Sequence, residues 1–438
     1  MKQIWAITKL NLKLLWRQKI ILAMLLIIPA ISLGIFFILS PDKDIVKDIQ
    51  FRIQYAYTAA YTVLTLMAIF IGAYVTRSQI DAKNIHFITS FPVSRWKIFI
   101  GQFLANTFLL LLNLIVLIIV IISSSFYYQS KHADKLTALE KSQLRNTRFE
   151  IKPTPLDLDQ LTRDRLKSFN VKVEKISAQD WILYVEQTRR ELQRLRPGQT
   201  KSWSFPAIDK ELLKSKDLDL FVRLNGRASQ EKVPLEIKII SSQGSKSFQA
   251  EAPTYQYHKI TLDSDAFPSG EDFRIELRHG NKSELLISYS SGIKILFQDS
   301  TFLKNTFNAL ILQALHLPVL NCLGMTAGIC FSFAVAGLIS LVTFLFSFAD
   351  FLSNALIYVD VEKLSPFEIF SANLLRYGLK VTQGIQSPPI IENIAQNLTI
   401  PFFTILNSWG PAIALNFLTL ALLGTYFLKR KELDKVQS

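Results

Sequence analysis

The fold is decided by residues 98–130, which read IFIGQFLANTFLLLLNLIVLIIVIISSSFYYQS. This stretch carries no charged residue and is longer than the roughly 20 residues that an α-helix needs to cross about 30 Å of hydrocarbon. Four other uncharged tracts are also long enough: 20–41, 53–76, 305–349 and 393–428. A soluble enzyme would intersperse its charges, so this pattern predicts an integral membrane protein.

Two of the tracts are too long for one straight crossing. Pro318 and Gly324 lie in the middle of 305–349, which predicts two helices joined by a tight turn near Leu317–Gly324. In the last tract, Pro401 and Gly410–Pro411 predict an irregular segment before the span itself. We therefore expect a polytopic α-helical membrane protein with about six transmembrane helices.

The charged residues make up only 19% of the chain and crowd into 129–304 and short flanks. Basic residues dominate the N-terminal segment, the loop 77–97 and the C-terminal tail, whereas loop 42–52 is balanced. Basic segments stay cytoplasmic, so both termini and the loop 77–97 are expected inside and 131–300 outside. This distribution explains the net charge of +14 without nucleic acid.

The first residues predict an amphipathic helix at the membrane surface. Lys2, Lys9, Lys13 and Arg17 fall on one side of a helix, and Ile7 lies on the other. The apolar run that follows is too long for a signal peptide and lacks a small-residue cleavage site.

The segment between the membrane halves 1–130 and 301–438 predicts an extracytoplasmic α+β domain, 131–300. Its first part, 131–196, has a helical pattern: Ala133–Asn146 would extend the third span, and Asp180–Arg196 would form an amphipathic helix. From Thr200 the period changes to two, with turn signals between short alternating runs, which predicts a β-sandwich over 200–300.

We find no pattern that predicts a catalytic residue, a metal site or a bound cofactor. His258 and His279 stand far apart, and Cys322 and Cys330 both lie in an apolar tract. No serine has the G-x-S-x-G context that a membrane-anchored hydrolase could use. No Gly-rich loop has the spacing that cradles phosphates, so any ATP would be bound by another subunit.

The loop at residues 81–105, DAKNIHFITSFPVSRWKIFIGQFLA, carries the most specific pattern. Asn84 can cap a short helix within 84–92, Pro92 ends that helix, and Ser94 can cap the next one. A short cytoplasmic helix braced between two spans would act as a lever on both.

This loop resembles the permease subunits of exporter-type ABC transporters of the second superfamily, the group that includes gliding-motility and copper-maturation permeases. The resemblance lies in an acidic residue, a Pro-Val-Ser-Arg motif and the start of the following span. Residues that match are Asp81, Pro92, Val93, Ser94, Arg95, Gly101, Phe103, Leu104 and Ala105. Lys83, Asn84, His86 and Gln102 depart from the usual pattern.

A second match precedes the last span. Ser365 and Glu368 form a capping box with Pro366 at the first helical position, which predicts a surface helix over 365–380. The basic tail after Thr425 is also similar to the end of these permeases.

The resemblance implies a bacterial cytoplasmic membrane protein in which two permeases, identical or homologous, associate with ABC ATP-binding subunits. The loop would be the coupling helix, with these residues at the ATPase contact: Asp81, Asn84, Phe87, Pro92, Val93, Ser94 and Arg95. Closure of the ATPase would then drive export.

Polar residues inside the predicted spans are candidates for a translocation path: Asn113, Asn308, Gln313, His316 and Asn321. The alternative is that they hold the bundle together by interhelical hydrogen bonds. A different class of function also fits the sequence: a membrane scaffold, or a protein that transmits force, whose outer domain binds an extracytoplasmic partner while nothing is transported.

Overall fold

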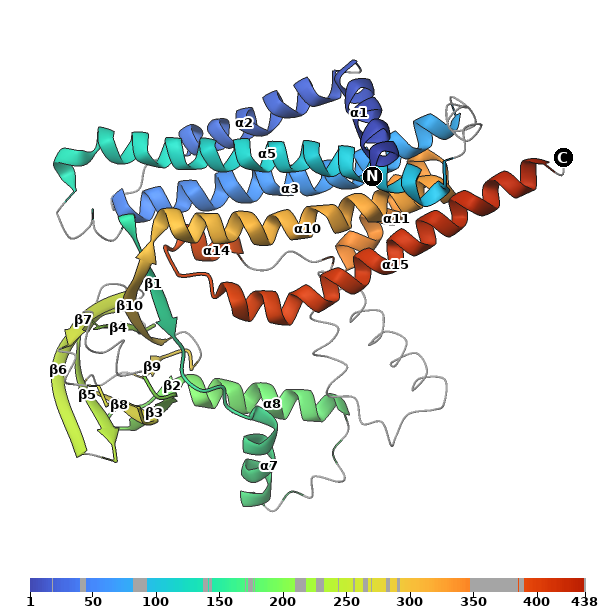
Figure 1. The fold of residues 1–438 in the computed structure, drawn as a ribbon. Coiled ribbons are helices and arrows are strands. Elements are labelled where there is room, and N and C mark those ends of the chain that lie inside the picture. The colour runs from blue at the N-terminus through green and yellow to red at the C-terminus, as the bar shows by residue number, and fades with distance from the viewer. Residues whose placement is uncertain are drawn as a thin grey trace. The chain divides into compact units, whose positions relative to one another are not determined.

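The computed structural model describes residues 1–17, 19–39, 45–81, 93–136, 141, 144–169, 171, 176, 178–208, 218–225, 232–242, 244–254, 257–262, 267–268, 270–280, 284–289, 292–346, 385 and 390–436. These residues form two compact units (Figure 1). The helical unit comprises Met1–Arg145 and the described residues from Thr301 onward, and the β unit comprises Asn146–Ser300. The surface helix predicted at 365–380 lies outside the described residues.

The helical unit is built from eight α-helices and one 3-10 turn in the described part of the chain. They are α1 (Lys2–Arg17), α2 (Ile20–Ile38), α3 (Ile45–Asp81), α5 (Arg95–Lys131), η1 (Ala133–Lys135), α10 (Phe302–Cys330), α11 (Phe333–Phe346), α14 (Ile390–Ala395) and α15 (Phe402–Val436). Among the described residues, α3, α5, α10 and α15 are each long and apolar enough to cross a membrane, and α1 with α2 passes the same criterion only as one bent pair. The length and apolar composition of these helices support the prediction of a membrane protein.

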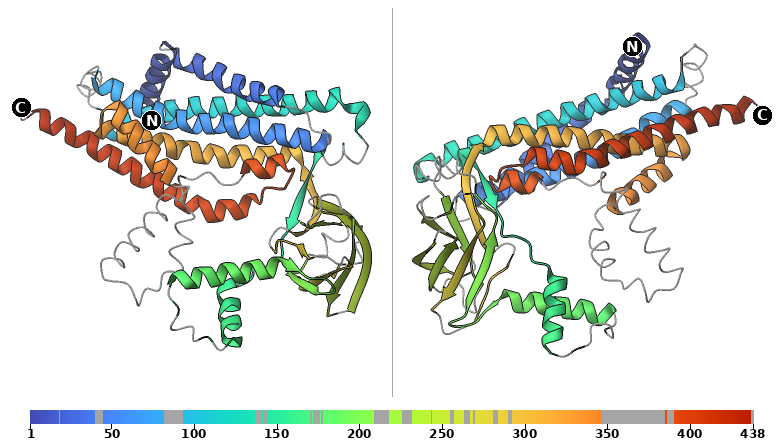
Figure 2. Two further views of the ribbon diagram at one scale, coloured as in Figure 1. Left: turned by 180° about the vertical axis from the view of Figure 1, so that it is seen from behind. Right: turned by 60° about the horizontal axis from the view of Figure 1, so that its bottom comes forward.

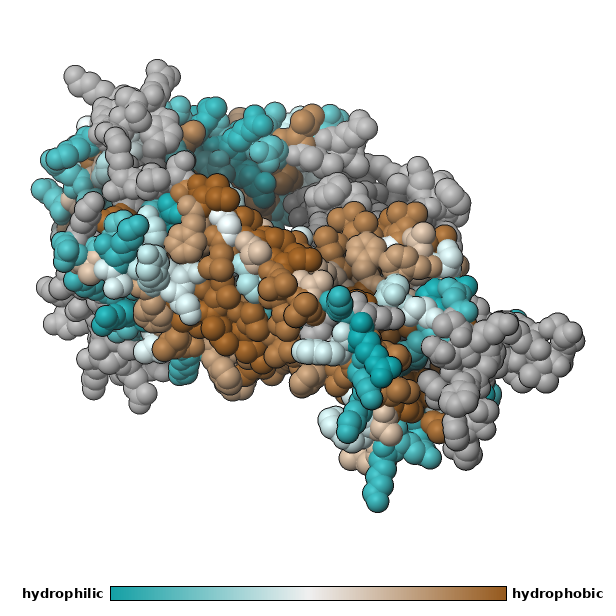
Figure 3. Space-filling model, turned by 90° about the horizontal axis from the view of Figure 1, so that it is seen from above, coloured by the Kyte–Doolittle hydropathy of each residue, from teal (hydrophilic) through white to brown (hydrophobic). Residues whose placement is uncertain are grey.

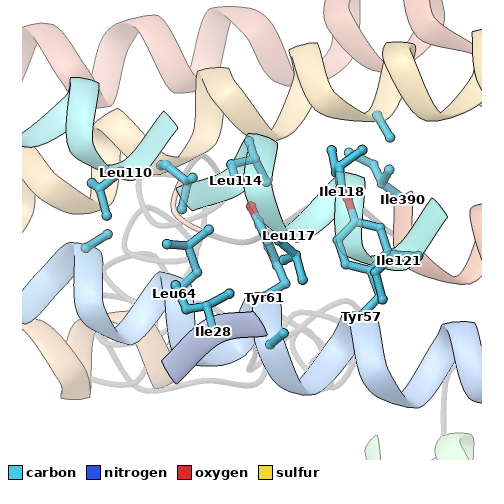
Figure 4. Packing of buried hydrophobic residues seen from close by; sticks show 14 of the residues in the cluster. Ile28, Tyr57, Tyr61, Leu64, Leu110, Leu114, Leu117, Ile118, Ile121 and Ile390 are labelled. Atoms are coloured by element: carbon cyan, nitrogen blue, oxygen red, sulfur yellow. The ribbon is translucent and has the colours of Figure 1, made fainter. Parts of the chain in front are cut away.

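The helices α3, α5 and α10 run side by side in every view (Figure 2). Their contact surfaces are filled by leucine and isoleucine, with Tyr57 and Tyr61 of α3 lying among Leu117, Ile118 and Ile121 of α5 (Figure 4). On the face seen in Figure 3, hydrophobic side chains cover the middle of the helical unit and hydrophilic side chains lie toward its ends. An apolar belt between polar ends is the arrangement that a bilayer requires.

The turn predicted near Leu317–Gly324 is wrong. The helix α10 continues through Pro318 and Gly324 to Cys330, and the chain breaks only at Phe331, before the 14-residue α11. A Cβ atom at Gly324 would lie 2.1 Å from the Ile69 carbonyl oxygen of α3. The glycine therefore serves close helix packing, as small residues do in membranes, where proline inside a helix is also tolerated.

The start of the last span also differs in part from the prediction. Pro401 precedes α15, as expected, but Gly410 and Pro411 lie inside this helix. Three of the charged residues of the predicted loop 42–52, Lys47, Asp48 and Arg52, belong to α3, which begins at Ile45.

The β unit contains two four-stranded sheets, with strand orders β1-β10-β4-β7 and β3-β8-β5-β6, and a small pair β2-β9. The strands are β1 (Asn146–Ile151), β2 (Arg194–Leu195), β3 (Thr200–Phe205), β4 (Leu218–Arg223), β5 (Lys232–Ser241), β6 (Gly244–Pro253), β7 (Tyr257–Leu262), β8 (Phe273–His279), β9 (Leu285–Leu286) and β10 (Ile293–Thr301). Antiparallel pairing joins β10 to β4, β4 to β7, β3 to β8, and β5 to both β8 and β6.

The period-two pattern correctly predicted several of these strands. Leu235, Ile237 and Ile239 of β5 are buried while the residues between them are more exposed, and β8 shows the same alternation. Both four-stranded sheets contribute to one hydrophobic cluster. The burial of these apolar side chains from water is the main force that holds the unit together.

The helical pattern predicted for 131–196 is only partly correct. The helices α7 (Leu158–Ser168) and α8 (Ala178–Gln193) form, and α8 matches the predicted amphipathic helix. However, α5 ends at Lys131 and does not extend to Asn146, where strand β1 begins. This strand is too short for its alternation to stand out from the helical pattern around it.

Candidate functional site

The predicted polar residues Gln313 and His316 of α10 face two tyrosines of α3. The Tyr57 hydroxyl donates to Gln313 Oε1 at 2.6 Å, and the Tyr61 hydroxyl lies 3.0 Å from His316 Nδ1. His316 Nε2 lies 2.6 Å from the Ile385 carbonyl oxygen. Because a carbonyl only accepts, Nε2 carries the proton and Nδ1 accepts from Tyr61. We call Tyr57, Tyr61, Gln313 and His316 the tyrosine ladder.

A second contact joins α10 to α5 through asparagines. Asn106 Nδ2 donates to Asn321 Oδ1 at 3.2 Å, and Asn321 Nδ2 lies 3.4 Å from both the Phe103 carbonyl oxygen and Thr107 Oγ1. The helix α3 also packs closely against Asn321, because a Cβ atom at Gly72 of α3 would lie 2.4 Å from the Asn321 carbonyl oxygen. Asn321 was predicted as a path residue, whereas Asn106 was missed.

The other two predicted path residues are not part of these contacts. Asn113 donates to the Leu109 carbonyl oxygen of its own helix at 2.9 Å, and Asn308 is half-buried. Within the described part of the chain, five buried polar side-chain atoms of α3, α5 and α10 have no hydrogen-bond partner: Thr76 Oγ1, Arg77 Nε, Asn106 Oδ1, Asn113 Oδ1 and Gln313 Nε2. The described path candidates thus pair mainly between helices, with a few unused donors and acceptors.

A buried polar contact also joins α1, α3 and α5 near the predicted coupling loop. Gln79 Nε2 donates to Asn11 Oδ1, and Gln102 Nε2 donates to Gln79 Oε1. Asn11 Nδ2 is held by the Ile7 carbonyl oxygen of its own helix at 3.0 Å. All three polar side chains are buried. We call Asn11, Gln79 and Gln102 the glutamine bridge.

The amphipathic helix α1 is fixed on α5 by further contacts at this end. A Cβ atom at Gly101 would lie 2.6 Å from Ile7 Cγ2, and Lys97 Nζ donates to Gln3 Oε1 at 2.9 Å. The lysines of α1 are exposed, as predicted for a helix at the membrane surface. Gly101, one of the residues that carry the family resemblance, is therefore a packing position.

The predicted coupling residues are only partly described. Asp81 is the last residue of α3 and forms an ion pair with Arg77 at 2.7 Å. Ser94 occupies the cap position before α5, as predicted, although its side chain accepts no hydrogen bond from the first turn. Val93 and Arg95 border the same helix end. Asn84, Phe87, Pro92 and the short helix 84–92 lie outside the described residues.

At the opposite end of α3 and α5 lies a charged group that sequence reasoning missed. Arg52 donates through Nε to Asp48 at 3.0 Å and through its two terminal nitrogens to the carbonyl oxygens of Phe36 and Leu39, at 2.5 and 2.6 Å. The Tyr128 hydroxyl donates to the other Asp48 oxygen at 2.6 Å, and the guanidinium lies 4.7 Å from the Tyr128 ring centre. We call Asp48, Arg52 and Tyr128 the arginine cluster.

The arginine cluster closes the end of α2. The last carbonyl groups of a helix have no partner within the helix and must be satisfied otherwise, and here Arg52 supplies the donors. The sequence pattern places Asp48 and Arg52 in a loop with balanced charges, because nothing in it indicates that these two side chains are buried.

Comparison with protein-family models, curated proteins and solved structures finds no match for this chain.

Proposed function

We propose that this chain is the membrane-spanning permease subunit of an ATP-driven ABC exporter. The observation that carries the proposal is the glutamine bridge, which ties the surface helix α1 to both helices that border the loop 82–92. The resemblance of residues 81–105 to exporter permeases assigns this loop to the contact with an ATP-binding subunit. A push on the loop would then reach α1, α3 and α5 together.

The proposed transmission continues from α3 into the centre of the bundle. The helices α3 and α10 are pressed together at Gly324 and Gly328, where added Cβ atoms would lie 2.1 and 2.6 Å from carbonyl oxygens of α3. The tyrosine ladder joins the same two helices. We therefore expect α3 and α10 to move as one body when the ATPase closes, because closure biases two packing arrangements of the membrane helices.

The proposal includes the finer topology. About six spans, with α2 and α11 counted among them, place both termini and the loop 82–92 in the cytoplasm. The β unit is then an extracytoplasmic β-sandwich. Two permeases and two ATP-binding subunits make up the complex, in a bacterial cytoplasmic membrane.

The test is co-purification of full-length tagged protein from mild detergent. The double variant Phe87→Ala, Arg95→Ala in the coupling loop is compared with Phe169→Ala, Arg189→Ala, an exposed pair of the same chemistry in the β unit. We expect an ATP-binding subunit with the wild type and the control pair, and its loss with the loop pair. The absence of any ATP-binding subunit from the wild type would contradict the proposal.

A second candidate function is a scaffold that transmits force without transport. It is favoured by the hydrogen bonds that the described intramembrane polar residues make with one another, because side chains engaged in such bonds do not line an open path. Under this reading the β unit binds an extracytoplasmic partner. Co-purification of an extracytoplasmic protein without an ATP-binding subunit would support it.

A further inference from the structure

We propose that the crevice between α10, α11 and α15 binds one anionic phospholipid. The crevice has a volume of about 460 Å³, within the range of about 300–1,000 Å³ that is usual for ligand pockets. Its apolar walls come from α10, from α11, which follows α10 directly, and from α15, which is distant in the sequence and packs against α10 (Figure 1). Residues that define it are Leu323, Ala327, Phe331, Ile339, Phe427 and Arg430.

The crevice has charge at one place. Arg430 is exposed and lines the crevice, and among the side chains that the structure describes none forms an ion pair with it. A second guanidinium contacts one of the lining residues, because Arg77 donates from Nη1 to the Phe331 carbonyl oxygen at 3.3 Å. The Arg77 charge is already balanced by Asp81 at 2.7 Å. Among the described side chains at the crevice, Arg430 is therefore the cation left to bind an anion.

The neighbouring surface indicates what kind of molecule carries that anion. Leu338, Val342 and Leu345 of α11 and Leu422 of α15 are apolar and between 55% and 61% exposed, so they are suited to contact lipid chains. A ligand with an acyl chain in the apolar crevice and a phosphate at Arg430 satisfies both parts of the site. A soluble phosphate would leave the apolar walls unused.

The test is native mass spectrometry of the full-length protein in detergent, titrated with phosphatidylglycerol or with phosphatidylcholine of the same chain length. We expect one phosphatidylglycerol to bind with higher affinity than phosphatidylcholine. One basic residue near a membrane surface changes the affinity for an anionic lipid by about five-fold. Arg430→Gln should therefore weaken phosphatidylglycerol binding about five-fold and remove the preference between the two lipids.

Two matched controls make the result specific. Lys429→Gln removes the same charge from the adjacent exposed residue, which does not line the crevice, and should retain the preference. Ile339→Trp should fill the crevice and abolish the binding of both lipids, whereas Leu338→Trp, one residue away and 61% exposed, should not. Unfolding temperatures of all four variants verify folding, and Arg430→Gln tests the site even if Ile339→Trp is unstable.

Three results would overturn the proposal. If Lys429→Gln weakened phosphatidylglycerol binding as much as Arg430→Gln does, the lipid would be attracted only by the general positive charge of this surface. Equal affinity of the wild type for both lipids would mean that Arg430 does not recognise the net negative charge of the headgroup. Displacement of the bound lipid by glycerol phosphate, which has no acyl chain, would show that the apolar crevice contributes nothing.

Discussion

The two ends of the α3–α5 pair are held by different chemistry. At one end the charged Arg52 donates to Asp48 and to two carbonyl oxygens at the end of α2, and Tyr128 completes the group. At the other end neutral amides make single hydrogen bonds between Asn11, Gln79 and Gln102.

The difference has an energetic consequence. Breaking a buried ion pair by removing one partner costs about 3–5 kcal/mol, whereas a hydrogen bond between membrane helices contributes about 0.6 kcal/mol on average. The arginine cluster therefore fixes one end, and the glutamine bridge can exchange partners at a low cost. A lever needs a fixed end and a moving end, and the moving end adjoins the proposed ATPase contact.

The largest effect is expected from Arg52→Ala. The variant leaves the Asp48 carboxylate buried without its cation and the end of α2 without donors, so the free energy of unfolding should fall by about 3–5 kcal/mol. Unfolding in mixed micelles measures it. The double variant Asp48→Asn, Arg52→Met leaves no buried charge and should be more stable than Arg52→Ala. A fall below about 1 kcal/mol for Arg52→Ala would break the comparison.

Tyr128→Phe should have the next largest effect. It removes the hydrogen bond to Asp48 and keeps the aromatic ring over Arg52, so we expect a loss of about 1–3 kcal/mol. The control is Tyr127→Phe, because this neighbouring side chain is exposed. Equal effects of the two variants on thermal unfolding would argue against a special role of the Asp48 contact.

Gln79→Leu should destabilise the protein less. It removes two interhelical hydrogen bonds and leaves two buried amides with fewer partners, which together are worth about 1 kcal/mol. The adjacent Ser78→Ala serves as control, because within the described residues its hydroxyl bonds only inside α3, at 3.2 Å from the Val75 carbonyl oxygen. If Gln79→Leu destabilised as strongly as Arg52→Ala, the two ends would be alike.

The smallest effect is expected for the coupling free energy between the arginine cluster and the glutamine bridge. Combining Arg52→Ala with Gln79→Leu should give additive losses to within about 0.5 kcal/mol, because the two groups share no partner among the described side chains. A double-mutant cycle on unfolding free energies measures this coupling. A coupling energy well above that value would show that the ends are one network.

The sequence predicted the spans that depend on composition and the strands that depend on alternation. Residues 98–130 lie within α5, and Phe273, Ile275 and Leu277 are buried in β8 as their period required. These predictions are correct because the length of an apolar tract and the spacing of its apolar residues depend directly on which side chains are buried.

What the sequence did not predict depends on neighbours. Gly324 and Pro318 have the pattern of a turn, yet a glycine that permits close helix contact looks the same in one sequence. Asp48 and Arg52 were interpreted as loop charges because their burial follows only from α2 and Tyr128. Asn11 was the one visible signal of the glutamine bridge, since it is a polar residue on the apolar side of α1, between Ile7 and Leu15.

The most direct test of the proposed lever is hydrogen–deuterium exchange on the purified complex with its ATP-binding subunit, with and without ATP. We predict that ATP changes exchange in α1 and at the start of α5, around Gln102, while the end of α2 and the last turns of α5, around Tyr128, stay unchanged. A change at the Tyr128 end as large as that at the Gln102 end, or no change at the Gln102 end, would contradict the account.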